Sequence, residues 1–245
     1  MTQTAVIPDY LKSAMERLET ARSAHLANAS RMDETTTAIS QVRTQKNELE
    51  QENGNDSGAW RSAFRAGGAV ITDELKQRHI ARVARRELAQ ECDNMNEVLS
   101  FELDSLKGAC DRTARAYRQA HHGALSQYAE HELDVALREN CGALVRAMKL
   151  SILVKENPLA NTIGHQGYVE PEHAVMHKVK TWLEQAVRSC NIRLTDEPVL
   201  FKTGLSASTL PHMDHDVATT PGQRKVWQEK MREREANLKE RGLLS

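Results

Sequence analysis

Aromatic residues are scarce in this chain of 245 residues, since Phe, Trp and Tyr together make up only 4% of it. Aromatic side chains usually supply much of the apolar area that a globular core buries. Charged residues, by contrast, account for 27% of the chain. This balance favours long helices with exposed polar faces over a thick globule.

Long apolar runs and a charge excess are also missing. The sequence has no hydrophobic N-terminal signal and no apolar run near 18 residues. A membrane-spanning helix needs about 20 apolar residues, so we expect a protein that is neither secreted nor inserted in a membrane. The formal net charge is −1, which argues against a strongly basic nucleic-acid-binding protein but leaves room for local basic patches.

The four cysteines are widely spaced and form no CxxC pair: Cys92, Cys110, Cys141 and Cys190. Free cysteine behaves as a small apolar residue, and disulfides are rare in the cytoplasm. We therefore interpret these residues as packing residues in a reducing compartment.

Motifs that carry chemistry are absent, because GxxxxGK[ST], GxSxG and GxGxxG do not occur. His173 and His177 lie one helical turn apart, and residues 212–216 read HMDHD. Neither spacing matches a known metal-ligand pattern such as HExxH, so polar surface residues are the better interpretation. The pair His121-His122 fits a pH-sensitive site or a helix C-terminus. We expect no catalytic residue, metal or cofactor, and no enzyme.

A long helical region dominates residues 72–157, which contain no proline. Apolar or small residues recur there at steps of four, four and three, an eleven-residue repeat that keeps one face of a nearly straight helix apolar. Gly123 and a five-residue step from Tyr128 to Leu133 interrupt the pattern. Two alternatives follow: one helix with a phase slip, or two helices that meet near residues 122–131.

The remaining segments complete an all-α prediction. Residues 1–53 form an N-terminal helical arm with a weak apolar seam and a possible break at Thr35–Thr37, and residues 54–71 form a linker with a short helix. The C-terminal region divides further into a loop at 158–171, an amphipathic helix at 172–191, extended chain or a short strand at 192–221, and a charged helix at 222–241. The overall prediction is an elongated, coiled-coil-like fold with an irregular, proline-containing C-terminal segment (158–245).

Two surfaces of the long helical region are candidates for contact with partners. A basic ridge with helical spacing consists of Arg78, Arg82, Arg85 and Arg86. Three interpretations compete for it: a solvated helix face, a dock for an acidic protein surface, and contact with a nucleic-acid backbone. Candidates for self-association lie on the apolar stripe: Leu88, Met95, Leu99, Leu103, Leu106, Tyr117 and Leu125.

Several stretches of the sequence, in order, carry a resemblance to a known family. They include RMDET (31–35), WRSAFRA (60–66), DELKQRHI (73–80), LKGACD (106–111), YAEHEL (128–133), ALVRAM (143–148), ENPLANT (156–162), TGLSA (203–207), RKVWQ (224–228) and RGLLS (241–245). The chain resembles Sid, the capsid size-determination family of enterobacterial satellite phages. The resemblance covers nearly the whole chain, although none of the stretches is a chemical motif.

The resemblance implies an external scaffold. Sid proteins assemble as a homo-oligomeric cage outside a procapsid made of the helper phage's major capsid protein, in the host cytoplasm, and so direct a smaller icosahedral shell. As a hypothesis, the basic ridge contacts the shell and the apolar stripe contacts other copies, while nucleic acid is an unlikely partner. The alternatives are a regulatory binding protein of a satellite phage, such as a polarity-suppression protein that inhibits Rho, and a nucleic-acid-binding protein.

Overall fold

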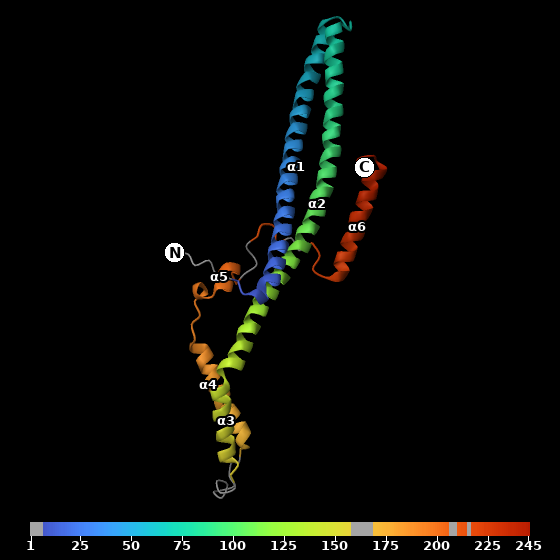
Figure 1. The fold of residues 1–245 in the computed structure, drawn as a ribbon. Helices are drawn as coiled ribbons and strands as arrows, with labels where there is room; N and C mark the ends of the chain where they lie inside the picture. Colours follow the sequence, from blue (N-terminus) through green and yellow to red (C-terminus); the bar gives the residue numbers. More distant parts are fainter. Residues whose placement is uncertain (1–6, 158–168, 206–209, 215–216) are drawn as a thin grey trace. The chain divides into compact units, whose positions relative to one another are not determined.

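The computed structural model describes residues 7–157, 169–205, 210–214 and 217–245. All regular elements in these ranges are helical (Figure 1). In order they are η1 (Asp9–Leu11), α1 (Lys12–Ala66), α2 (Asp73–Val135), the π-helical turn η2 (Ala136–Asn140), α3 (Gly142–Lys155), α4 (Pro171–Ser189), η4 (Leu194–Asp196), α5 (Pro198–Thr203) and α6 (Pro221–Glu240). The prediction of an all-α protein with long helices is confirmed.

Helix α1 continues through residues 54–58, where the sequence predicted a linker. The prediction was wrong because contacts with α2 outweigh the low helix propensity of Asn and Gly. Asp56 forms an ion pair with Arg85, and the indole Nε1 of Trp60 donates a hydrogen bond to the Leu75 carbonyl at 3.0 Å. The predicted short helix of residues 60–66 is therefore the last part of α1.

The helix is also unbroken at Thr35–Thr37, where the sequence suggested a break. Each of the three hydroxyls donates a hydrogen bond to the carbonyl four residues earlier, at 2.8–2.9 Å. Threonine hydroxyls that bond in this way lose their ability to draw the backbone out of the helix. The threonine run is thus absorbed into α1.

A tight turn joins α1 to α2. Gly68 and Ala69 both have positive φ, at 66° and 64°, and glycine adopts that conformation without strain. The Thr72 hydroxyl then accepts a hydrogen bond from the Leu75 amide at 3.3 Å, so the predicted helix start at Thr72 is confirmed. As a result α1 and α2 run antiparallel, side by side (Figure 1).

Helix α2 passes through Gly123 without interruption. The alternative of two helices meeting at 122–131 is therefore wrong. The residues on either side of Gly123 explain this, because Ala124 is fully buried and the buried His121 ring bonds the Gly204 carbonyl at 3.0 Å. The irregularity lies further on, in the π-helical turn η2, and a turn of that kind accommodates one extra residue.

The chain divides into two compact units, and the boundaries fall within α1 and α2. We call residues 19–118 and 208–245 the hairpin unit, since it holds most of α1 and α2 together with α6. We call residues 7–18 and 119–205 the α3–α4 unit; it also holds the end of α2, η4 and α5.

The hairpin unit holds α1 against α2 by a narrow apolar seam. Met32, Leu106 and Cys110 are buried together, and Leu103 packs against them. Polar cross-links continue the contact away from this cluster: Lys46 Nζ lies 2.7 Å from Asp93 Oδ1, and Arg31 lies 3.5 Å from Glu102. The hydrogen bond from Lys46 to Asp93 raises the pKa of that ammonium group, which favours its charged form.

In the α3–α4 unit, α3 packs against α4 and α5 packs against η4, and residues next to α5 form hydrogen bonds with the end of α2. The Tyr128 hydroxyl donates to the Glu197 carboxylate, and this hydrogen bond raises the pKa of the tyrosine. The predicted extended chain or strand around 199–201 was wrong, because these residues belong to α5. Pro198 begins that helix and the buried Val199 anchors it, which fits the preference of proline for the first helical turn.

The two other C-terminal helices agree with the sequence prediction. Helix α4 matches the predicted segment 172–191, and α6 matches the segment 222–241. Helix α6 starts with a capping box in which Thr220 and Gln223 exchange hydrogen bonds. Most of the predicted loop at 158–171 lies outside the described residues.

Candidate assembly surfaces

The four arginines of the predicted basic ridge have different surroundings in the hairpin unit. Arg85 is partly buried and forms an ion pair with Asp56 across the hairpin, and its Nε lies 3.5 Å from Glu52. An arginine held in this way ties α2 to α1. Arg85 therefore stabilises the hairpin itself. Of the other three, Arg78 and Arg86 are exposed and Arg82 is partly buried.

The other members of the ridge remain accessible. Arg78 pairs with Glu74 on its own helix at 2.9 Å, and such an exposed pair contributes little to stability. The Arg82 guanidinium lies 5.8 Å from the centre of the Trp60 ring, within the range of a cation–π contact. Arg86 is exposed and has no ion-pair partner among the residues that the structure describes.

The seven predicted self-association residues differ in how far they are buried. Leu106 and Tyr117 are buried within the chain, and Leu103 packs against the Met32 cluster. Leu88 and Met95 are 56% and 47% exposed, and Leu99 and Leu125 are partly exposed. The stripe thus serves the hairpin seam at some positions and faces solvent at Leu88 and Met95.

A different face of α2 is covered by α6, a contact that the sequence analysis missed. An ideal Cβ at Gly108 would lie 2.2 Å from the Trp227 ring, so only glycine allows this close approach. Arg234 Nη1 lies 2.7 Å from Asp104 Oδ2, and Arg241 Nη1 lies 2.7 Å from Glu97 Oε1. A glycine inside a long helix and a tryptophan inside a charged helix were the signals that could have revealed the contact.

These ion pairs lower the pKa values of the acidic residues of α2 that form them. The hydrogen bond from Arg241 lowers the pKa of Glu97. Burial alone would raise the pKa of Asp104, but hydrogen bonds from Lys107 and Arg234 outweigh it and lower the pKa. Both carboxylates are therefore charged when they hold α6, and the contact depends on that charge.

The histidine candidates do not form a metal centre in the described part of the chain, where no group of three or more potential ligands was found. His173 and His177 lie on exposed positions of α4. His212 Nε2 lies 2.7 Å from Asp33 Oδ1, while His215 and Asp216 fall outside the described residues. None of the helices described here combines the length and apolar character that crossing a bilayer requires.

The rings of buried histidines instead form hydrogen bonds with backbone carbonyls of the C-terminal segments. In the hairpin unit the fully buried His25 ring lies 2.8 Å from the Pro211 carbonyl and 3.0 Å from the Thr113 hydroxyl. Arg118 donates a hydrogen bond to the Met213 carbonyl at 2.7 Å. Backbone carbonyls far from any helix are satisfied in this way, so these residues have a structural role.

The α3–α4 unit carries the largest concentration of exposed apolar side chains in the described residues. They occur on α3, α4 and the segment up to α5, and include Val145, Leu150, Leu153, Val154, Met176, Trp182, Val187, Ile192 and Phe201. Exposed apolar side chains gathered in one part of a protein are candidates for contact with a partner.

The whole chain is similar to a satellite phage protein. Glycoprotein 3 of Enterobacteria phage P4 is 65% identical over 239 residues, which covers 98% of either sequence. A solved structure of the satellite phage P4 procapsid including size determination (Sid) protein matches with a TM-score of 0.83 and 64% identity. The match covers 96% of this chain and 100% of that chain. No family model matches the sequence.

Proposed function

This chain belongs to the capsid size-determination (Sid) family and has a capsid size-determination scaffolding role; on that premise we propose that it assembles as an external cage on the procapsid of a helper phage. The observation that carries the proposal is the 65% identity across nearly the full chain. In this proposal the cage redirects the helper's major capsid protein into a smaller icosahedral shell, inside the host cytoplasm.

A stiff strut is what such a cage requires. The 55 residues of α1 and the 63 residues of α2 correspond to helices about 80 and 95 Å long at 1.5 Å per residue. Their seam, their ion pairs and the α6 contact hold them together. Identical struts that meet at one fixed angle close into a shell of one size, so stiffness is the property that converts a local contact into curvature.

The basic ridge supports a contact with the shell. Arg78 and Arg86 are exposed and Arg82 is partly buried at the end of the hairpin, beside the exposed Ile80 and Val83. Charges of one sign on an exposed surface favour a partner of the opposite sign and weaken their attraction as salt rises. We assign this end to an acidic surface of the major capsid protein.

The exposed part of the α2 stripe supports contact between copies. At 100° per residue, Met95 lies about 200° around the helix from Glu97, which holds α6. Leu88 and Leu99 lie within about 20–40° of Met95 on the same count. On the same count Leu106, which packs against α1, lies about 20° from Met95, so these residues border the seam with α1. Leu88 and Met95 remain 56% and 47% exposed there, and we assign them to contact with a neighbouring copy.

The proposed action needs binding alone, with no catalytic step, metal or cofactor. A scaffold that must later leave the shell is suited to many modest contacts, because a single large dry interface releases slowly. The basic ridge and the exposed part of the α2 stripe are contacts of this kind.

Co-expression with the helper's major capsid protein, followed by electron microscopy, tests the function. We expect small shells that carry density on their outer surface. Shells of the full size would contradict the proposal. A defect in transcription termination, or nucleic acid retained on the purified chain, would then support a regulatory or nucleic-acid-binding protein instead.

A further inference from the structure

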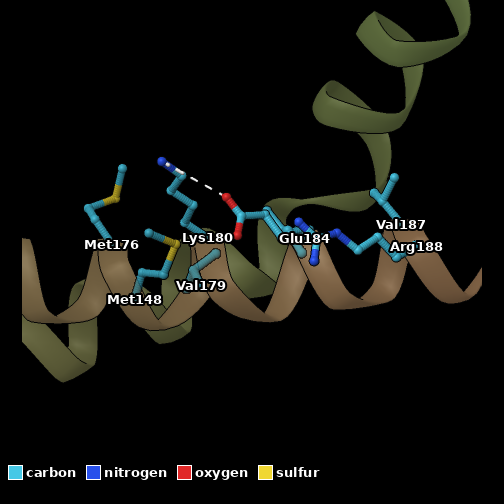
Figure 2. Close-up of a pocket in the computed structure, with 8 residues that line it drawn as sticks. Met148, Met176, Val179, Lys180, Glu184, Val187 and Arg188 are labelled. Carbon is cyan, nitrogen blue, oxygen red and sulfur yellow. Dashed lines mark ion pairs between the residues drawn. The ribbon is translucent and has the colours of Figure 1, made fainter.

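An open apolar groove of about 480 Å³ runs along α4 where it packs on α3 (Figure 2). Its apolar wall consists of Met148 from α3 and Met176, Val179, Leu183 and Val187 from α4. The α4 positions follow one another at steps of three, four and four residues. This spacing keeps them on one face of the helix.

The length of the groove fits a helix. Residues 176–187 of α4 span about 17 Å at 1.5 Å per residue, or three helical turns. An apolar seam with this spacing is the pattern by which one helix packs lengthwise on another. The two methionines add flexible, polarizable side chains that adapt to an incoming surface. The groove therefore has the shape and the chemistry to receive another helix.

The charges beside the groove identify which helix it receives. Three charged residues line it: Lys180, Glu184 and Arg188. Lys180 and Glu184 point to the same side (Figure 2), and Lys180 Nζ lies 4.0 Å from Glu184 Oε1. A strongly basic partner would be repelled by Lys180 and Arg188, and a strongly acidic partner would be repelled by Glu184. A surface that carries both signs one turn apart is complementary to a second copy of itself in the opposite direction.

We propose that this groove is an interface between copies of the chain, in which α4 of one copy packs antiparallel on α4 of a second copy. The inference deepens the proposed function and rests on it for the expectation that copies meet. Lys180 and Glu184 are equally far from Trp182 along the helix. A twofold axis at the level of Trp182 therefore places Lys180 of each copy opposite Glu184 of the other.

The same arrangement covers the apolar wall. The apolar side chains of the two α4 helices interdigitate between the charged pairs, and Met148 of each copy closes the groove from α3. In the free chain Val187, at one end of the wall, is 72% exposed. Contact with a second copy removes this side chain from water, which favours association.

Single charge reversals, measured by sedimentation velocity at low ionic strength, test the interface. We expect the unmodified chain to form oligomers as its concentration rises. Lys180→Glu and Glu184→Lys each place like charges opposite one another, so each variant alone should associate about tenfold more weakly. An equimolar mixture of the two variants should recover the association of the unmodified chain, because opposite charges then meet again.

The mixture is decisive, since a contact with another protein or within one helix is not repaired by mixing two variants. A mixture that stays as weak as its components overturns the proposal, as does an unmodified chain that remains monomeric at the highest concentration. Val187→Asp and Val226→Asp provide a matched pair, because Val226 on α6 is similarly exposed, at 65%, but lies outside the groove. We expect only Val187→Asp to weaken association.

The same variants in co-expression separate this inference from the proposed function. Small shells from the unmodified chain, together with no effect of the single reversals on sedimentation, would refute the groove and leave the scaffold intact. Full-size shells from a chain that does associate through the groove would refute the scaffold and leave the interface intact.

Discussion

The hairpin unit and the α3–α4 unit are both helical, yet the α3–α4 unit leaves more of its large apolar side chains exposed. The hairpin unit places Met32, Leu106 and Cys110 between its helices and ties the helices by ion pairs such as Lys46–Asp93. The α3–α4 unit leaves Met176, Val187 and their neighbours facing solvent. We infer that the hairpin unit is stiff by itself, whereas the α3–α4 unit is completed by contact with a partner.

Replacing a methionine of each unit by alanine should give the largest difference in unfolding free energy between the two units. Met32 is 5% exposed and Met176 is 54% exposed. We expect Met32→Ala to cost about 2–5 kcal/mol of unfolding free energy, because it opens a cavity in the seam. Met176→Ala should change it by less than about 0.5 kcal/mol. Urea denaturation followed by circular dichroism measures both, and equal losses would contradict the division.

Glycine replacement gives the next largest effect. At Gly108 an added Cβ meets the Trp227 ring, whereas at Gly123 no described heavy atom outside the helix's own backbone lies within 4 Å. Gly108→Ala should therefore cost about 1–3 kcal/mol through displacement of α6. Gly123→Ala should stabilise α2 by up to about 1 kcal/mol.

Hydrogen exchange locates these two changes. Exchange of the α6 amides should accelerate in Gly108→Ala and remain unchanged in Gly123→Ala. If α6 keeps its protection in Gly108→Ala, the close contact with Trp227 does not hold that helix.

The two neighbouring arginines of the ridge should differ more modestly. Arg85→Ala removes the link to Asp56 and should cost about 1 kcal/mol. Arg86→Ala should leave unfolding unchanged, but it should weaken binding to shells at low salt more than at high salt. Thermal unfolding and shell co-sedimentation measure the two effects. A similar loss of stability for both arginines would remove the distinction between Arg85, which ties α2 to α1, and the exposed Arg86.

Acid should loosen the α6 contact in the hairpin unit, and this is the smallest of the expected effects. Glu97 and Asp104 have lowered pKa values in the folded chain, so their contribution is present above their ordinary pKa and is lost as the pH falls through the folded values. We expect α6 to loosen below about pH 4. The fluorescence of Trp227, in a chain with Trp60→Phe and Trp182→Phe, reports this. Loosening that persists in Glu97→Gln/Asp104→Asn would assign it to other groups.

The sequence predicted the helices well because their pattern is local. The eleven-residue repeat across α2 and the Thr72 helix start are properties of neighbouring residues. The predicted linker failed for the opposite reason, since residues 54–58 are helical only because Asp56 and Trp60 contact α2. Contacts between distant segments are not encoded in local propensity.

The same limit applies to the surfaces. The spacing of Arg78, Arg82, Arg85 and Arg86 identified a ridge, but only the structure separates Arg85 from the others by its pairing with Asp56. Likewise, Leu106 and Met95 belong to one stripe in sequence, while only Leu106 faces α1. The α6 contact and the α4 groove depend on which elements meet in space, which one sequence does not reveal.

Hydrogen exchange on the free chain and on the chain bound to procapsids tests the division between the units most directly. We predict that the seam of α1 and α2 is protected in both states, whereas α3 and α4 gain protection only on assembly. Equal protection of α3 and α4 in the two states, or a hairpin seam that becomes protected only on the shell, would contradict this account.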